Sequence, residues 1–288
     1  MTEIKKIAVL GAGLMGHGIA QVAAQFGRYE VTLRDVEQKF IDNGLHMIRE
    51  SLQRFLKKGQ ISEAEMNEIL TRIHPTLDLK AAVSNADLII EAVPEIPDVK
   101  KPLLRETDGY APPHAIIVTN TSSISITELA SATKRPEKFC GMHFFNPPQL
   151  MKLVEVVKGA KTSDETTQTV LEAAQTMGKE TVLVKKDCPG FIVNRILIPA
   201  LNEAAALYWE EVAERDDIDK AIKLGLNWPM GPLMLIDYIG ADTTLAIAEV
   251  LQKELDPKFH PNTGLKQMVK AQLLGRKTGK GFYDWTQK

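Results

Sequence analysis

The chain has few cysteines, no long apolar run and almost no net charge, and each absence excludes a class of protein. Two cysteines among 288 residues, Cys140 and Cys188, cannot supply a disulfide framework and favour a reducing, cytoplasmic compartment. Neither lies in a Cys/His cluster, so no metal site is predicted. No apolar run reaches the roughly 18 residues of a membrane span. An apolar strand begins soon after Met1, so no targeting leader is expected.

The overall charge and composition limit the binding partners. A net charge of −2 provides no basic field, which argues against sequence-independent binding of nucleic acid. Apolar residues make up 44% of the chain and charged residues 25%, as in an ordinary globular protein. A length of 288 residues favours two domains. Any anionic ligand must therefore be held by local groups.

A glycine-rich loop directly follows the first apolar strand. The strand spans residues 4–10, and the loop reads G-A-G-L-M-G at residues 11–16. Apolar side chains then repeat at helical spacing from Ile19 to Phe26. Between a strand and a helix, such a loop lets a dinucleotide pyrophosphate approach backbone N–H groups at the helix N-terminus. The predicted cofactor contacts here are Gly11, Gly13, Leu14, Met15 and Gly16.

A second strand, residues 29–35, ends on an acid, Asp35. An acid about twenty residues beyond the glycine loop accepts hydrogen bonds from the adenosine ribose of NAD and repels the 2′-phosphate of NADP. The alternative is that Asp35 only caps the next helix. The neighbouring Arg34 could accept a phosphate, but the pattern favours NAD.

Residues 37–72 interrupt the alternation of strands and helices with a predicted helical hairpin. Apolar residues recur every three or four positions from Ile41 to Phe55, and Gly59 ends this helix. Ser62 and Glu65 have the spacing of a capping box that starts a second helix. Basic side chains lie mostly off the apolar stripe. That basic side is either solvated surface or a contact for phosphate groups of a substrate.

Two further buried strands, residues 87–93 and 115–119, each end in polar residues. Glu95 follows the first strand, and Asn120, Thr121, Ser122 and Ser123 follow the second. In a doubly wound sheet the ligand lies outside the carboxyl ends of the strands, so these groups should point toward the same crevice as the glycine loop. The alternative for residues 120–123 is capping of a short helix that begins near Ser125.

A histidine and a carboxylate lie on either side of a tight connection. Predicted strands at 138–144 and 152–158 are joined through Asn146 and two prolines, so His143 and Glu155 would face each other. A carboxylate that fixes the histidine tautomer makes a general base that works near neutral pH. The alternative is a satisfied core histidine with no chemical role.

The composition changes at residues 187–190, which we take as the domain boundary. A helix around 165–177 and a short strand at 180–184 precede it, and the chain is helical from Phe191 to about Gly275. We therefore predict an α/β domain at 1–187, Rossmann-like with a mostly parallel sheet and the projecting hairpin, and an all-α domain at 188–288. Asn194, among apolar residues of the first helix after the boundary, has either a buried partner or a substrate oxygen to bind.

Six motifs, in order along essentially the whole chain, resemble those of the L-3-hydroxyacyl-CoA dehydrogenase family, and the chain end is similar to its 3-hydroxybutyryl-CoA branch. The resemblance implies hydride transfer between NAD(H) and a short-chain 3-hydroxyacyl-CoA/3-ketoacyl-CoA pair. It also implies a homodimer formed through the helical domain, which would help to bind the acyl-CoA. The motifs occupy residues 11–20, 120–123, 143–147, 151–155, 189–195 and 279–283.

The same resemblance implies roles for individual residues. His143 would exchange a proton with the substrate 3-hydroxyl, and Glu155 would orient His143. Ser122 and Asn194 would hydrogen-bond the substrate oxygens. Further cofactor contacts would come from Asp35, Glu95, Lys100, Ser122 and Asn146, and contacts with CoA from Ser51, Lys57 and Lys58 on the hairpin.

Two positions depart from the family pattern. The turn at residues 27–29 is one residue longer than usual, which could shift Asp35. Pro102 lies where the family continues a helix, so that helix should start later or bend, which weakens the assignment of Lys100.

Two alternative functions stay open at this point. One is an NAD-dependent dehydrogenase of a free hydroxy or sugar acid. Such an enzyme would not need CoA contacts, and the basic hairpin favours a CoA substrate instead. The other is a non-catalytic NAD(H)-binding protein, against which the set His143, Glu155 and Ser122 favours catalysis.

Overall fold

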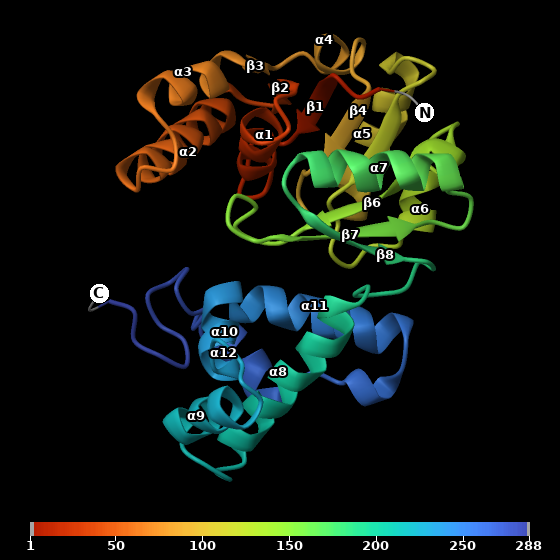
Figure 1. Ribbon diagram of the computed structural model, residues 1–288. Coiled ribbons are helices and arrows are strands. Elements are labelled where there is room, and N and C mark those ends of the chain that lie inside the picture. Colours follow the sequence, from red (N-terminus) through yellow and green to blue (C-terminus); the bar gives the residue numbers. More distant parts are fainter. Residues whose placement is uncertain (1–2, 287–288) are drawn as a thin grey trace. The chain divides into compact units, whose positions relative to one another are not determined.

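The computed structural model describes residues 3–286 and divides the chain into two compact units, residues 1–188 and 189–288 (Figure 1). The division falls one residue after the expected boundary at Asp187. Each unit has its own cluster of buried apolar side chains.

The first unit is built on an eight-stranded sheet with the order β3-β2-β1-β4-β5-β6-β7-β8. Neighbouring strands are parallel except for the antiparallel pair β6 and β7. The predicted mostly parallel sheet is thereby confirmed. The strands are β1 Lys6–Leu10, β2 Glu30–Arg34, β3 Ile73–Thr76, β4 Leu88–Glu91, β5 Ile116–Thr119, β6 Phe139–Phe144, β7 Leu153–Lys158 and β8 Glu180–Val184.

Helices pack against this sheet, and α2 and α3 form the predicted hairpin (Figure 1). Gly59 lies in the left-handed region (φ +68°) just beyond α2, and Ser62 and Glu65 form the expected capping box of α3. The local residues thus suffice to define both ends of the hairpin turn. The helices of this unit are α1 Gly16–Gln25, α2 Gln38–Lys57, α3 Glu63–Thr71, α4 Leu79–Val83, α5 Pro97–Tyr110, α6 Ile126–Ala130, the 3₁₀ helix η1 Pro136–Lys138 and α7 Asp164–Thr176.

The short elements β3 and α4 are not among the predicted ones. The sequence of β3, Ile-His-Pro-Thr, contains Pro75, which cannot donate a ladder hydrogen bond. The strand is accommodated because β3 lies at the edge of the sheet.

The expectation of a later start for the helix around Pro102 is wrong. Helix α5 begins at Pro97 and contains Pro102 in its interior. The carbonyl that loses its N–H partner is that of Asp98, one turn earlier, and Asp98 is exposed, so this carbonyl can face water. Lys100 therefore lies within a formed helix.

The second unit is helical, as predicted, and its core lies between α8 and the helices that follow. Leu201, Leu233, Ile236 and Leu251 are fully buried in that core. Its helices are α8 Val193–Trp209, α9 Arg215–Gly225, α10 Pro232–Ile239, α11 Ala241–Glu254, the 3₁₀ helix η2 Pro257–Phe259 and α12 Thr263–Lys270.

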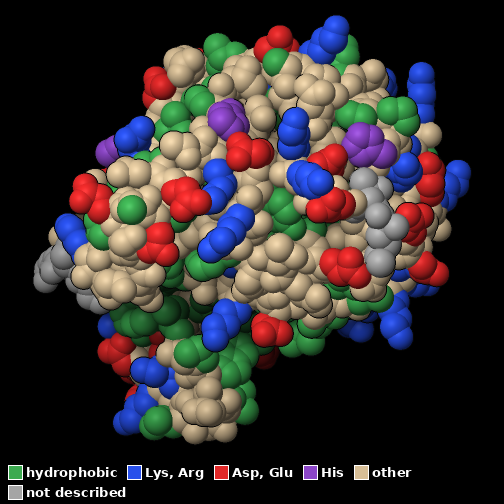
Figure 2. Space-filling view, turned by 45° about the horizontal axis from the view of Figure 1, so that its top comes forward, with side chains coloured by type: hydrophobic (Ala, Val, Ile, Leu, Met, Phe, Trp, Pro, Cys, Tyr) green, Lys and Arg blue, Asp and Glu red, His purple; other side chains and the backbone are tan. Residues whose placement is uncertain are grey.

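The surface carries charges of both signs. In Figure 2, lysine and arginine side chains are interspersed with aspartate and glutamate side chains over the visible face. Within residues 3–286, none of the helices is long and apolar enough to span a bilayer.

A buried carboxylate, Asp237 on α10, anchors the C-terminal segment of the second unit. It accepts hydrogen bonds from the backbone N–H groups of Phe282 (2.9 Å) and Tyr283 (2.8 Å) and from the indole of Trp285 (2.9 Å). Burial raises the pKa of Asp237, and these three hydrogen bonds offset that rise only in part. One side chain thus joins three residues of this segment to α10.

We expect Asp237→Ala to destabilise the second unit by about 3 kcal/mol, because three buried or part-buried donors lose their acceptor. Urea titration followed by tryptophan fluorescence measures this directly. All three tryptophans, Trp209, Trp228 and Trp285, belong to the second unit, so the signal reports its unfolding.

Asp242→Ala is the matched control for this substitution. Asp242 is partly exposed and pairs with Lys277, so its loss should lower the free energy of unfolding by about 1 kcal/mol or less. Equal losses for the two variants would contradict the anchoring role of Asp237.

Candidate active site

The glycine loop turns tightly between β1 and α1. Gly11 has φ +105°, and a Cβ there would lie 2.6 Å from the carbonyl oxygen of Ala92. A Cβ on Gly16 would lie 1.8 Å from the carbonyl oxygen of Gly11. Only glycine fits at these two positions.

The same loop leaves room for an anion. A Cβ on Gly13 would meet nothing within 4 Å, so this backbone faces open space, and Leu14 next to it is exposed. The first turn of α1 carries no acid, and the helix dipole favours a negative group at this end. The loop therefore fits the pyrophosphate of a dinucleotide.

Asp35 lies beside the loop and holds it. One carboxylate oxygen accepts a hydrogen bond from Ala12 N (2.7 Å) and the other from Val36 N (2.6 Å). The alternative that Asp35 caps α2 is wrong, because Glu37 occupies that position. The Nε of Arg34 donates to the carbonyl oxygen of Leu77 (3.2 Å), so this guanidinium donor is already used within the protein.

The expected pairing of His143 with Glu155 is confirmed. The two residues are directly opposite in the antiparallel register of β6 and β7, and His143 Nδ1 lies 2.8 Å from Glu155 Oε2. Both are buried, with 5% and 0% of their surface exposed. A carboxylate at Nδ1 fixes the proton there and leaves proton exchange with a substrate to Nε2.

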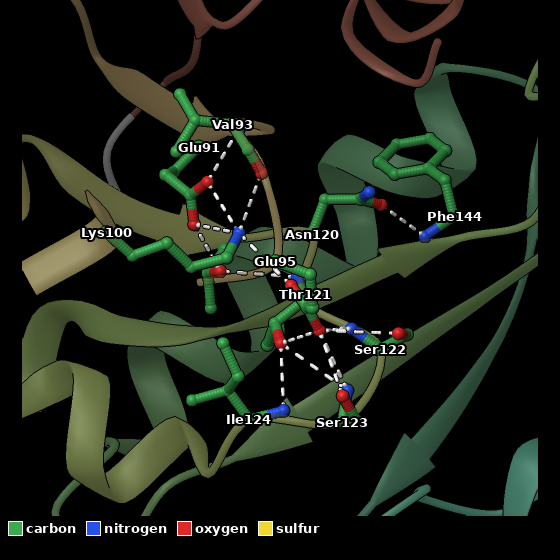
Figure 3. A network of polar contacts seen from close by, with 11 residues as sticks. Glu91, Val93, Glu95, Lys100, Asn120, Thr121, Ser122, Ser123, Ile124 and Phe144 are labelled. Carbon is green, nitrogen blue, oxygen red and sulfur yellow. Dashed lines mark hydrogen bonds and ion pairs between the residues drawn. The ribbon is translucent and has the colours of Figure 1, made fainter. Parts of the chain in front are cut away.

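The connection between these two strands, residues 145–152, carries Asn146 at its start. Asn146 is exposed. Just before it, Phe144 ends β6 and is anchored to the residue that follows β5. Its backbone N–H donates to the side-chain oxygen of Asn120 (2.9 Å). Asn120 thus ties the carboxyl end of β6 to that of β5 (Figure 3).

The loop after β5 wraps around a single carboxylate oxygen, Glu95 Oε1 (Figure 3). Backbone N–H groups of Ser122 (2.8 Å) and Ser123 (3.1 Å) donate to it, as do the hydroxyls of Thr121, Ser122 and Ser123. Helix α6 is capped by Ser125 instead, so the capping alternative for residues 120–123 is wrong. Glu95 therefore fixes the position of Ser122.

A buried ion pair lies beneath Glu95. Lys100 Nζ is 2.7 Å from Glu91 Oε1, 3.1 Å from the carbonyl oxygen of Val93 and 3.3 Å from Glu95 Oε2. Thr119 donates its hydroxyl to Glu91 at 2.6 Å. Lys100 and Glu91 are almost fully buried. Lys100 therefore lies under Glu95, beside the carboxyl end of β4.

Glu91 and Thr119 were not among the predicted site residues. A signal exists in the sequence, because Glu91 is a charged residue that ends an otherwise apolar strand, and a buried acid requires a partner. The identity of that partner follows only from the fold.

The remaining predicted residues lie elsewhere. Lys57 and Lys58 are exposed at the end of α2, whereas Ser51 is only 5% exposed, on the buried side of the same helix. Asn194 belongs to the second unit, where it is buried near the start of α8. Residues 3–286 contain no group of three or more His, Cys, Asp or Glu side chains placed to hold a metal ion.

Two family models together match nearly the whole chain. The model of the 3-hydroxyacyl-CoA dehydrogenase NAD binding domain matches residues 6–188. The model of the 3-hydroxyacyl-CoA dehydrogenase C-terminal domain matches residues 190–285.

Similar proteins match over their full length. A probable 3-hydroxybutyryl-CoA dehydrogenase of Deinococcus radiodurans is 50% identical over 97% of this chain and 100% of its own. The 3-hydroxybutyryl-CoA dehydrogenase of Clostridioides difficile is 46% identical over 98% of this chain and 100% of its own. The crystal structure of (S)-3-hydroxybutyryl-CoA dehydrogenase from Ralstonia eutropha has a TM-score of 0.94 at 42% identity, covering 99% of this chain and 100% of that one.

The charge on Glu95 should contribute to stability in a pH-dependent way. Burial disfavours its ionisation, but the Lys100 ammonium and the hydrogen bonds from residues 121–123 outweigh burial and hold the pKa of Glu95 below its ordinary value of 4.5. A lowered folded-state pKa gives a contribution that is complete above the unfolded-state value and is lost as the pH falls through the folded-state value.

We therefore expect Glu95→Gln to melt below the wild type at about pH 7 and the gap to narrow as the pH falls toward about 3. Thermal melts followed by far-ultraviolet circular dichroism measure this gap. Glu106→Gln, at an exposed position of α5, the helix that follows Glu95, should show almost no gap at either pH. A gap for Glu95→Gln that is constant with pH would exclude its lowered pKa as the cause.

Proposed function

Because the chain belongs to the 3-hydroxyacyl-CoA dehydrogenase family, we propose that it interconverts acetoacetyl-CoA and (S)-3-hydroxybutyryl-CoA with NAD(H). Its first unit is an NAD-binding domain of that family. The observation that carries the proposal is the buried His143 and Glu155 pair. The pair lies near the carboxyl end of β6. Strand β6 is parallel to β1, β4 and β5, and the glycine loop follows the carboxyl end of β1, so both lie at the same edge of the sheet.

His143 moves the proton in this proposal. Glu155 holds Nδ1–H, so Nε2 takes the proton of the substrate 3-hydroxyl during oxidation and returns it during reduction. The carboxylate also stabilises the imidazolium that forms. When bound, NAD(H) supplies the hydride chemistry at substrate C3.

The cofactor contacts follow the carboxyl edge of the sheet. The loop residues Gly11, Gly13, Leu14, Met15 and Gly16 hold the pyrophosphate. Each oxygen of Asp35 accepts one backbone hydrogen bond and keeps capacity for a ribose hydroxyl, which supports NAD over NADP. Toward the nicotinamide, the contacts are Glu95, Ser122 and Asn146, and Lys100 acts through Glu95.

Two groups of residues are the proposed acyl-CoA contacts. Ser122, fixed by Glu95, and Asn194 hydrogen-bond the substrate oxygens. Lys57 and Lys58 attract the CoA phosphates from the exposed end of α2. Ser51 is the third residue of this proposed set; it precedes Lys58 by about two helical turns but lies on the buried side of α2.

We also propose a cytoplasmic homodimer. Large apolar side chains are exposed on the second unit, among them Ile196 (70%), Leu224 (76%) and Leu226 (61%), and contact with a second copy would cover such a surface. The low cysteine content fits a reducing compartment.

The test of the function compares thioester and free acid. NADH oxidation, followed by absorbance, should proceed with acetoacetyl-CoA and be negligible with acetoacetate or sugar keto-acids. His143→Ala should lower kcat by about 10²- to 10⁴-fold with an unchanged Kd for NADH, because only proton transfer is lost. Turnover of the free acids without turnover of the thioester would overturn the proposal.

Replacing both Lys57 and Lys58 by Ala should raise KM for acetoacetyl-CoA roughly tenfold and leave KM for NADH unchanged, because phosphate contacts weaken without a change at the cofactor. The effect should shrink at high salt. Lys5 and Lys6, exposed at the amino end of β1, provide the matched control pair. If KM for acetoacetyl-CoA changes equally for both pairs, Lys57 and Lys58 do not contact CoA specifically.

A further inference from the structure

Lys179 is a buried lysine with no part in the chemistry proposed so far. It lies between α7 and β8, directly after Gly178 (φ +74°), and only 7% of its surface is exposed. Within residues 3–286, no carboxylate pairs with its ammonium group. Burial lowers the pKa of Lys179. Burying an ammonium group is unfavourable unless hydrogen bonds compensate for the lost water, so the hydrogen bonds of Lys179 are what make its burial possible.

The Lys179 ammonium group makes its hydrogen bonds to the connection between β6 and β7. Nζ donates to the carbonyl oxygens of Pro148 (2.5 Å) and Met151 (2.8 Å). The connection is further closed on itself, since the N–H groups of Leu150 and Met151 both donate to the carbonyl oxygen of Pro147 (3.0 Å). The ammonium group thus joins both ends of one turn.

The other side of the connection packs on α1, the helix that follows the glycine loop. A Cβ on Gly18 would lie 2.9 Å from Pro148 Cδ and 2.9 Å from Gln149 Oε1, so these two side chains pack directly on the backbone of α1. The Gln149 amide donates to Gln21 Oε1 (3.2 Å). The connection is therefore fixed between Lys179 on one side and the cofactor helix on the other.

We propose that Lys179 is a positioning residue that holds the connection so that Asn146 meets the nicotinamide end of the cofactor. This role rests on the proposed function, which makes Asn146 a cofactor contact. Asn146 lies two residues before Pro148, and no regular secondary structure separates them. A lysine suits the task because one compact ammonium group can donate to two carbonyl oxygens that converge on a point.

The test separates the two ends of the cofactor. ADP-ribose carries the adenosine and pyrophosphate of NADH but lacks the nicotinamide. Lys179→Met keeps most of the aliphatic volume and removes the donors, so calorimetric titration should show NADH binding about tenfold weaker and ADP-ribose binding unchanged. A role limited to stability would weaken both ligands alike or neither, and either result would overturn the proposal.

Controls make the outcome decisive. Lys161→Met removes an exposed lysine of the same unit and should leave both affinities at wild-type values. If Lys179→Met does not fold, Lys179→Gln is used, because it retains an amide donor. This variant should also bind NADH more weakly with unchanged ADP-ribose affinity, by a smaller factor. An unchanged ratio of the two affinities in the folded variant counts against the proposal.

The wild type distinguishes this inference from the function on which it rests. If the wild type neither binds NADH nor reduces acetoacetyl-CoA, the proposed function fails. If it does both and the Lys179 variants keep the wild-type ratio of affinities, only the positioning role fails.

Discussion

The register between β6 and β7 is the constraint on which the candidate active site depends. Side chains alternate between the faces of a sheet, so a slip of one residue would put Glu155 on the opposite face from His143. The connection of residues 145–152 has to reverse the chain without such a slip. Its contacts with Lys179 and with α1 therefore bear on the pairing of His143 with Glu155 as well as on Asn146.

A carboxylate holds an irregular segment in each of the two units. The Glu91 and Lys100 pair supports Glu95, which in turn gathers the loop after β5. In the second unit, Asp237 gathers the C-terminal segment in the same manner. Glu95 and Asp237 each accept two backbone N–H groups as well as side-chain donors, so removing either carboxylate leaves several donors without their partner. Irregular segments that apolar packing alone cannot order are held this way.

Parallel strand order explains why residues far apart in the sequence meet at one edge. Strands β1, β4, β5 and β6 run in the same direction, so the segments after them emerge together. The glycine loop, Glu95, Ser122 and Asn146 all lie in those segments. An edge of this kind is where doubly wound sheets bind their ligands.

Seven of the eight strands, the glycine loop, the hairpin and the facing of His143 and Glu155 could be predicted from the sequence, because each follows from periodicity, glycine placement or a short connection. The short elements β3 and α4 could not. The position of Lys100 under Glu95, the burial of Ser51, the continuation of α5 through Pro102 and the binding of Lys179 to the connection emerge only in the folded chain. Those outcomes depend on side chains brought together from distant segments, and on which face of a helix meets the core. Local patterns carry no record of such partners, since the pairing exists only once the sheet has assembled.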